Sequence, residues 1–294
     1  MNRTDAGRTS AGRDGVVLAT RTPDRARALA EALRKRRLRL ILSPLRAPRA
    51  LTEPELDALD SALGGGPWEA ATFTSVNGLR GLRAGLARLH AAGRSVHAEP
   101  AALLAGTQVH CVGRATAEEA RAQGLTPAAE TAAGEEEQSA RGLLTRLGRA
   151  GAPGSVLCVH GRPHRPELAD GLRELGARVT EAVAYAMADW PAPEPLGGQA
   201  PGAAGEERPA ESAAPALDRQ ATAEVLHERA ADVVLVTSPR QLEALHFLGP
   251  LPEPVVCLGS TTVARARELG LAAVTAVSPA PEDLAEAALR ARSG

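Results

Sequence analysis

The sequence predicts an α/β protein made of two similar parallel-sheet units, and three observations lead to this fold class. A strand–turn–helix segment occurs twice: CVGRATAEEARAQGL at 111–125 and CLGSTTVARARELGL at 257–271 are identical at seven of fifteen positions. Two further segments are repeated in the same form. Short apolar strands also alternate with helical patterns along the chain, which is typical of parallel sheets with right-handed crossovers.

The other two repeats follow the same strand–turn–helix order. ATFTSVNGLRGL at 71–82 resembles VLVTSPRQLEAL at 234–245. VVLATRTPDRARALAEAL at 16–33 resembles SVLCVHGRPHRPELADGL at 155–172 after a small slip at the turn. Two long copies of a unit do not make a solenoid, because a solenoid stacks several short repeats. We therefore expect two similar α/β layers.

The first elements follow a polar N-terminal tail. Residues 1–14 lack an apolar stretch, so we expect a flexible tail and no signal peptide. Order is expected to begin with the strand at 16–20, to continue through an Arg-rich turn into an amphipathic helix, and to reach a second apolar segment at 38–45. Residues 189–222 are rich in Pro, Ala, Gly and Glu without apolar periodicity, which predicts a disordered insert.

The composition is that of a soluble globular protein and excludes several classes of partner. Of 294 residues, 44% are hydrophobic and 23% charged, with a formal net charge of −1, so no overall field attracts nucleic acid or a membrane surface. Aromatic residues make up 2%, too few for base-stacking platforms. No run approaches the ~18 apolar residues of a membrane span. We expect a cytoplasmic protein.

The three cysteines are expected to be buried thiols. Cys111, Cys158 and Cys257 each lie in a short apolar run that predicts a strand. They form no CxxC or Cys/His pattern, so the sequence predicts no zinc site and no other metal. No nucleophile elbow, no Walker A loop and no GxGxxG after a strand is present.

Four turns between a strand and a helix are candidate anion-binding sites. They are TSVN at 74–77, GRAT at 113–116, TSPR at 237–240 and GSTT at 259–262. In parallel sheets, ligands bind beyond the carboxyl ends of the strands, where helix N-termini offer backbone N–H groups to carboxylates or phosphates. The candidate binding residues in these turns are Thr74, Ser75, Asn77, Gly113, Thr116, Thr237, Ser238, Gly259 and Thr262.

The simpler interpretation of each turn is an ordinary helix cap. Ser and Thr are common N-caps, and Thr116 with Glu119 matches the capping-box pattern. Four such turns meeting at one cleft would instead indicate a binding site. The neighbouring loops add Arg21, Arg162 and Arg165, which are either anion ligands or solvated surface arginines.

The HGRPHR loop also contains two histidines. His160 and His164 are candidates for a base or a ligand, although a polar loop histidine is the simpler interpretation.

With these units in order, the sequence resembles the uroporphyrinogen-III synthase family. Each motif is weak, but their order and spacing together are specific, and they span the chain apart from the tail and the insert. The segments that carry the resemblance are VLATRTPDRARALAEAL, FTSVNGLRGL, CVGRATAEEARAQGL, HGRPHRPELADGLRELGARV, AVAY, VTSPRQLEAL and CLGSTTVARARELGL.

The resemblance implies two similar parallel-sheet α/β domains joined by a two-stranded linker. The first domain is discontinuous, at 15–45 and 186–294, and the second covers 46–185. The linking strands would be at about 40–50 and 179–188. The two GxxT turns would then lie in opposite domains, one on each side of a cleft.

The resemblance also implies an activity. The family cyclises and dehydrates hydroxymethylbilane, a linear tetrapyrrole polycarboxylate, with inversion of ring D to give uroporphyrinogen III in haem biosynthesis. It uses no metal or cofactor, and we expect a monomer without nucleic-acid or membrane partners. Tyr185 matches the tyrosine that is the family's leading candidate to help the hydroxyl leave. Where the family often has Arg-Gly, this chain has His160-Gly161, so Arg162 and Arg165 are the candidates for that anion contact.

Two other functions stay open. One is a non-catalytic tetrapyrrole- or anion-binding regulatory module on the same fold. The other is a two-domain sugar- or anion-binding protein, which the absence of a signal peptide disfavours.

Overall fold

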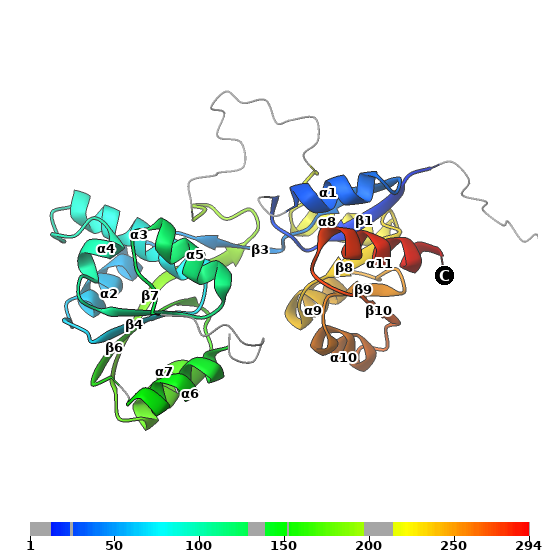
Figure 1. The fold of residues 1–294 in the computed structure, drawn as a ribbon. Coiled ribbons are helices and arrows are strands. Elements are labelled where there is room, and N and C mark those ends of the chain that lie inside the picture. Colours follow the sequence, from blue (N-terminus) through cyan, green and yellow to red (C-terminus); the bar gives the residue numbers. More distant parts are fainter. Residues whose placement is uncertain (1–12, 24–25, 129–138, 152, 197–213, 294) are drawn as a thin grey trace, which may run out of the picture. The chain divides into compact units, whose positions relative to one another are not determined.

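The computed structural model describes residues 13–23, 26–128, 139–151, 153–196 and 214–293. The contacts divide the chain into two compact units (Figure 1). One unit holds the elements β1 to β2 together with α8 to α11, and the other holds β3 to β7.

The first unit is a five-stranded parallel sheet with the strand order β10-β9-β8-β1-β2. Its strands are β1 (Gly15–Ala19), β2 (Leu38–Leu42), β8 (Val233–Val236), β9 (Val255–Cys257) and β10 (Ala273–Thr275). Its helices are α1 (Arg27–Arg34), α8 (Arg219–His227), α9 (Pro239–Leu248), α10 (Ser260–Glu268) and α11 (Pro281–Ser293).

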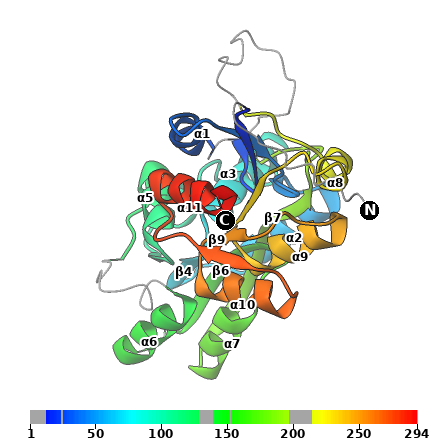
Figure 2. The ribbon, with the colours of Figure 1, turned by 90° about the vertical axis from the view of Figure 1, so that its right-hand side faces the viewer.

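Helices cover both faces of this sheet, which explains why its strands are almost continuously apolar. Val17 and Ala19 of β1 pack with α1 and α11, which lie side by side in both ribbon views (Figures 1 and 2). Val16 and Leu18, on the opposite face, pack with α8, α9 and α10. This alternation is the period of two that a strand imposes on its side chains.

The second unit is a five-stranded sheet with the order β3-β7-β6-β4-β5. All its pairs are parallel except β3 with β7. Its strands are β3 (Arg46–Arg49), β4 (Ala70–Phe73), β5 (Gln108–Cys111), β6 (Ser155–Arg162) and β7 (Arg178–Asp189). Its helices are α2 (Glu53–Leu63), α3 (Val76–Ala91), α4 (Pro100–Leu103), α5 (Arg114–Ala122), α6 (Ala140–Ala150) and α7 (Glu167–Glu174).

This sheet is also covered on both faces. Ala71 and Phe73 of β4 pack in a core with α2, α3, α4 and α5. Ala70 of β4 and Val156 of β6 face α6 and α7, which pack against each other (Figure 2). The two units therefore share one three-layer plan.

The strand orders confirm the predicted fold class and explain the repeats. In the first unit the order β2-β1-β8-β9 places the repeated strands beside one another. In the second unit the order β7-β6-β4-β5 places their counterparts in the same positions. The strands before the two Thr-Ser turns, β4 and β8, are therefore equivalent, as are β5 and β9 before the two GxxT turns. The three cysteines are buried free thiols, as expected.

The second of the two boundaries between the units differs from the expected one. The apolar segment at 38–45 contains β2, which joins the first sheet. The next strand, β3, pairs antiparallel with β7 from Arg46↔Asp189 to Arg49↔Ala186. Residues 186–196, expected in the first domain, lie in the second unit because β7 runs on to Asp189 and the Leu196 N–H donates to the Pro48 carbonyl.

The predicted insert at 189–222 is only partly described. Residues 197–213 lie outside the described residues, as do residues 1–12 of the tail. In contrast to the expectation, both described flanks of the insert are held in place. The Leu42 N–H donates to the Pro215 carbonyl, and α8 begins at Arg219. Composition does not reveal such backbone hydrogen bonds at a sheet edge, which is why the sequence did not predict them.

Candidate active site

Each sheet has one point where the strand order reverses, and the two Thr-Ser turns lie at these points. The reversal lies between β1 and β8 in the first unit and between β6 and β4 in the second. In open α/β sheets this is the position beyond the carboxyl ends where ligands bind. The Thr-Ser turns follow β8 and β4 directly.

The turn after β8 is joined to β1 by Gln241, a residue that no sequence motif indicates. The Thr237 hydroxyl donates to Gln241 Oε1 over 2.7 Å, and the Thr20 hydroxyl donates to the same oxygen over 3.0 Å. Gln241 Nε2 donates to the Thr20 carbonyl over 3.1 Å. Ser238 caps α9 by accepting from the Gln241 N–H. Arg21 is half-buried in the turn that follows β1.

The turn after β4 has the same backbone but a different partner. Ser75 (φ −158°, ψ 155°) and Ser238 (φ −153°, ψ 154°) have nearly identical N-cap conformations. Ser75 Oγ accepts from the Gly78 N–H over 3.2 Å, and it also lies 3.3 Å from the Tyr185 hydroxyl. Asn77 is half-buried in the first turn of α3.

Tyr185 is held on β7 by two close approaches that require glycine. A Cβ added to Gly161 of β6 would lie 2.2 Å from Cζ of the Tyr185 ring. A Cβ added to Gly81 of α3 would lie 2.4 Å from the Ala184 carbonyl oxygen and 3.1 Å from the Tyr185 Cβ. Glycine is therefore needed at 161 to seat the ring, so the predicted site residue Gly161 contributes space to the site.

The two GxxT turns bury their threonines. Gly113 is the N-cap of α5 with a φ of 81°, a conformation that favours glycine. Thr116 and its counterpart Thr262 lie inside the first helical turn and are 4% and 2% exposed. The predicted Thr116–Glu119 capping box is wrong, because α5 begins at Arg114 with Gly113 as its cap.

Gly259, in the other turn, has an extended backbone with no atom within 4 Å of an added Cβ. These two turns therefore offer backbone N–H groups more readily than hydroxyls.

One cavity, of about 860 Å³, lies within the second unit. It is bordered by β6, α6, α7 and the loop between β6 and α7. The lining includes three predicted site residues, Thr74, Arg165 and Tyr185, together with His160 and His164.

The remaining predicted residues do not line this cavity. Arg162 is exposed, and its Nη1 lies 3.5 Å from Glu55 Oε1, a carboxylate that Arg49 also binds. Asn77, Gly113 and Thr116 lie elsewhere at the carboxyl edge of the same sheet. Arg21, Thr237, Ser238, Gly259 and Thr262 belong to the first unit.

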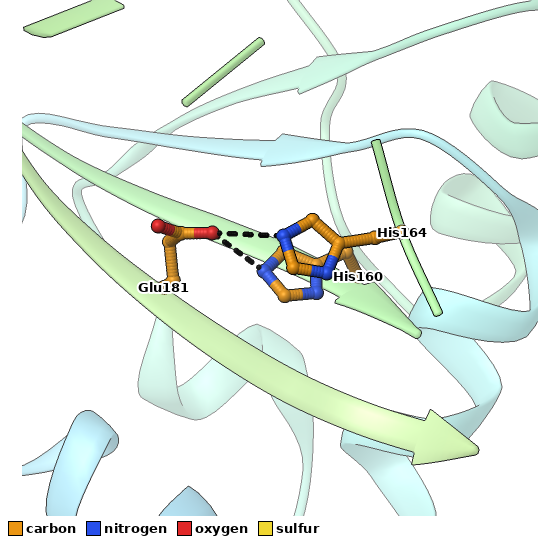
Figure 3. A group of neighbouring side chains, drawn as sticks. All are labelled: His160, His164 and Glu181. Carbon is orange, nitrogen blue, oxygen red and sulfur yellow. Dashed lines mark hydrogen bonds and ion pairs between the residues drawn. The ribbon is translucent and has the colours of Figure 1, made fainter. Parts of the chain in front are cut away.

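Two histidines and a glutamate form a cluster at this cavity. The rings of His160 and His164 are stacked with centroids 3.6 Å apart, and a nitrogen of each faces Glu181 (Figure 3). Both Nε2 atoms lie 3.1 Å from Glu181 Oε2. The sequence pattern indicates both histidines but not Glu181, because nothing local shows which residue of β7 lies beside His160.

Burial and charge fix the ionisation of this cluster. Burial lowers the pKa of His160, and the neighbouring His164 lowers it further. Burial alone would raise the pKa of Glu181, but the Arg173 guanidinium and His160 outweigh it and hold the pKa below its usual range. The cluster at neutral pH is therefore an anionic carboxylate beside a neutral, buried imidazole.

Comparison with known proteins gives the family. The model of the family described as uroporphyrinogen-III synthase HemD matches residues 27–286. The chain is similar to the structure of a mutant uroporphyrinogen III synthase from the extremely thermophilic bacterium Thermus thermophilus, with 19% identity, 94% of this chain and 99% of that chain covered, and a TM-score of 0.58. It is also similar to uroporphyrinogen-III synthetase from Helicobacter pylori, with 16% identity, 94% and 99% covered, and a TM-score of 0.55.

None of the curated proteins gives a significant match. At these identities the similar structures show the fold, while the family match spans most of the chain and both units. Together with the strand orders and the turns at both reversal points, it identifies the sequence resemblance as a true relationship. The chain belongs to the uroporphyrinogen-III synthase family.

Proposed function

We propose that this chain cyclises hydroxymethylbilane to uroporphyrinogen III with loss of water and inversion of ring D, and that Tyr185 assists departure of the hydroxyl. The observation that carries the catalytic assignment is the position of the phenol. It lines the cavity of the second unit and lies 3.3 Å from Ser75 Oγ, at the N-terminus of α3.

The contacts suggest a chain of donors that ends at the leaving group. The Gly78 N–H donates to Ser75 Oγ, and the Ser75 hydroxyl can donate to the Tyr185 oxygen. The phenol O–H is then free to donate to the departing hydroxyl oxygen. The positive end of the α3 dipole favours the negative charge that develops there. A separation of 3.3 Å is long for two hydroxyls, but such bonds are often long before substrate binds.

Binding of the substrate would fall to the turns and to Arg165. The substrate carries carboxylates on its rings, and helix N-termini bind carboxylates through backbone N–H groups. The starts of α3 and α5 provide these groups in the second unit, and the starts of α9 and α10 provide them in the first. Arg165 adds a positive charge at the cavity. Holding a flexible bilane in one conformation supplies catalysis by positioning.

The experiment is an assay with hydroxymethylbilane generated enzymatically in the same vessel, followed by isomer analysis of the oxidised product. We expect isomer III in excess, because unassisted closure gives the uninverted isomer I. Only isomer I, formed at the background rate in the presence of the purified chain, would contradict the proposal. Binding of the bilane under those conditions would identify the non-catalytic regulatory module instead.

We also infer a cytoplasmic monomer that acts on a small molecule without nucleic acid. A formal net charge of −1 and three buried free thiols support this. Of the helices in the described part of the chain, none combines the length and apolarity that crossing a membrane requires. Sedimentation of the purified chain at several concentrations tests the oligomeric state, and a mass above one chain contradicts it.

A further inference from the structure

The cluster of His160, His164 and Glu181 has the composition and spacing of a metal site. The three ligand atoms lie within 4.8 Å of one another, and each Nε2 is 3.1 Å from Glu181 Oε2 (Figure 3). Ligands about 2.0–2.1 Å from a tetrahedral ion are separated from one another by about 3.3 Å. The two nitrogen–oxygen separations are therefore close to the edge of such a tetrahedron. The histidine rings, stacked 3.6 Å apart, would turn apart on binding so that the in-plane lone pairs of both Nε2 atoms point at one ion.

The surroundings of the two ring nitrogens of His160 suit a bound cation. Its Nδ1 lies 3.3 Å from the Gly161 carbonyl oxygen, and its Nε2 faces the Glu181 carboxylate, so both ring nitrogens face an oxygen. A neutral imidazole has only one N–H to donate. A metal ion on Nε2, with Nδ1–H donating to the carbonyl, satisfies both nitrogens.

This arrangement is the usual environment of a metal-bound histidine, in which the second ring nitrogen donates to a backbone carbonyl or a carboxylate. Glu181 is also prepared for a cation. Its Oε1 accepts from Arg173 Nη2 over 2.5 Å, which orients the carboxylate and leaves Oε2 facing the histidines. Arg173 is itself paired with Asp170, so Arg173, Asp170 and Glu181 together keep one negative charge.

The elements that carry the ligands differ in rigidity and in access. His160 lies near the end of β6 and Glu181 lies in the adjacent strand β7, in the register Cys158↔Glu181 and His160↔Val183. His164, four residues beyond His160, lies in the loop before α7. The side chains of His164 and Glu181 are 34% and 28% exposed, so an ion can enter from solvent. Both histidines also line the cavity.

We propose that His160, His164 and Glu181 bind one divalent transition-metal ion of the zinc type, with the fourth position open toward the cavity. Two imidazoles and a carboxylate suit Zn²⁺ better than Mg²⁺ or Ca²⁺, which prefer oxygen ligands alone. Cys158 is not one of the three grouped residues. The sequence predicts no metal, because the ligands are on separate elements and match no spacing pattern.

The test is calorimetric titration of the purified full chain with Zn²⁺ alone at neutral pH. We expect one equivalent to bind. His164→Gln should weaken the affinity by about tenfold or more, since losing even a supporting group commonly costs that much. The matched control is His90→Gln, because His90 is an exposed histidine of the same unit whose Nδ1 contacts the Ser95 carbonyl. It should bind Zn²⁺ as the wild type does.

A second measurement uses Co²⁺, whose visible spectrum reports coordination number and ligand type. We expect a four-coordinate spectrum in the wild type that is lost in Glu181→Gln. His164 is exposed, so its replacement should not impair folding. If Glu181→Gln unfolds, the metal affinity of His164→Gln alone tests the proposal. Absence of stoichiometric Zn²⁺ binding, or equal affinity of wild type and His164→Gln, overturns the proposal. No substrate is present, so the result is independent of the proposed activity.

Discussion

Tyr185 owes its position to residues that are small rather than reactive. Gly161 leaves room beneath the ring, and Gly81 lets α3 approach the backbone of β7. Ser75 then reaches the phenol oxygen. At the scale of single residues, the site therefore depends on two glycines that leave space as much as on the residues that make contacts.

Tyr185→Phe separates the hydroxyl from the ring. Turnover should fall by about 10- to 100-fold if the phenol assists departure, at the lower end of what one acid group contributes. The free energy of unfolding should change by less than about 1 kcal/mol, because the ring remains packed on Gly161. Initial rates and urea unfolding of the two proteins check both parts. Full activity in the Phe variant would exclude the phenol from the mechanism.

The internal repeat supplies a matched pair of serines. Ser75→Ala and Ser238→Ala each remove an N-cap and should each lower the free energy of unfolding by about 1 kcal/mol. Of the two serines, Ser75 is the one that contacts Tyr185, so only its replacement should lower kcat further, by several-fold. Steady-state kinetics that separate kcat from KM distinguish the two. Equal effects on kcat would mean that Ser75 serves as a cap alone.

Gly161→Ala tests the close packing of the Tyr185 ring on Gly161. The added Cβ would lie 2.2 Å from the Tyr185 ring, so the ring must move, at a cost of about 1–3 kcal/mol in unfolding free energy and with loss of turnover. Gly259→Ala is the comparison for stability, because its backbone is extended and an added Cβ meets no atom within 4 Å. Thermal melting of both variants is the measurement. Equal melting temperatures would contradict the close packing.

At the scale of elements, the carboxylate of Glu55 links β3 to α2 and also caps the N-terminus of α2. Glu55 accepts from Arg49 over 2.6 and 2.8 Å and from the Thr52 N–H at the start of α2. The hydrogen bond from Arg49, only partly offset by burial, lowers the pKa of Glu55 from 4.5 to about 2. The carboxylate thus stabilises the junction between a strand and the next helix.

Glu55→Gln should lower the free energy of unfolding by about 1–2 kcal/mol near pH 7. Because the pKa is lowered by folding, this contribution is complete above pH 4.5 and is lost as the pH falls toward 2. The difference between wild type and variant should therefore shrink in acid.

Urea unfolding followed by tryptophan fluorescence suits this measurement. Trp68 and Trp190, the two tryptophans of the chain, both lie in the second unit. Glu118→Gln, which removes an exposed pair with Arg114 in the same unit, should change stability by less than about 0.5 kcal/mol. A difference for Glu55→Gln that stays constant from neutral to acid pH would rule out the ionised pair.

The elements themselves were largely predictable, because their signals are local. The strands at 16–20 and 71–73 and the turns after them follow from apolar runs and helix starts. Contacts between distant elements were not predictable. Gln241 meets Thr20 across 221 positions, and Glu181 reaches His160 only through the register of β6 with β7. The start of α5 was misplaced because Gly113, with a positive φ, provides a cap that Thr116 only resembles in sequence.

At the scale of the whole molecule, the repeat predicts that both units take part in binding. The turns after β4 and β5 in one unit have counterparts after β8 and β9 in the other. Backbone N–H groups at the starts of α3, α5, α9 and α10 should exchange more slowly with solvent when product is bound. Hydrogen exchange followed by mass spectrometry measures this. Protection confined to one unit would contradict a role for both.

The two units also differ in how the chain builds them. The second sheet uses one continuous stretch, whereas in the first the Val16 N–H bonds Asp232, 216 positions later. During synthesis from the N-terminus, β1 and β2 emerge long before β8 can join them. The second unit can fold while that edge of β1 is still unpaired, and unpaired apolar edges promote aggregation. A stalled or truncated chain would thus contain one folded unit and one incomplete sheet that is prone to aggregate.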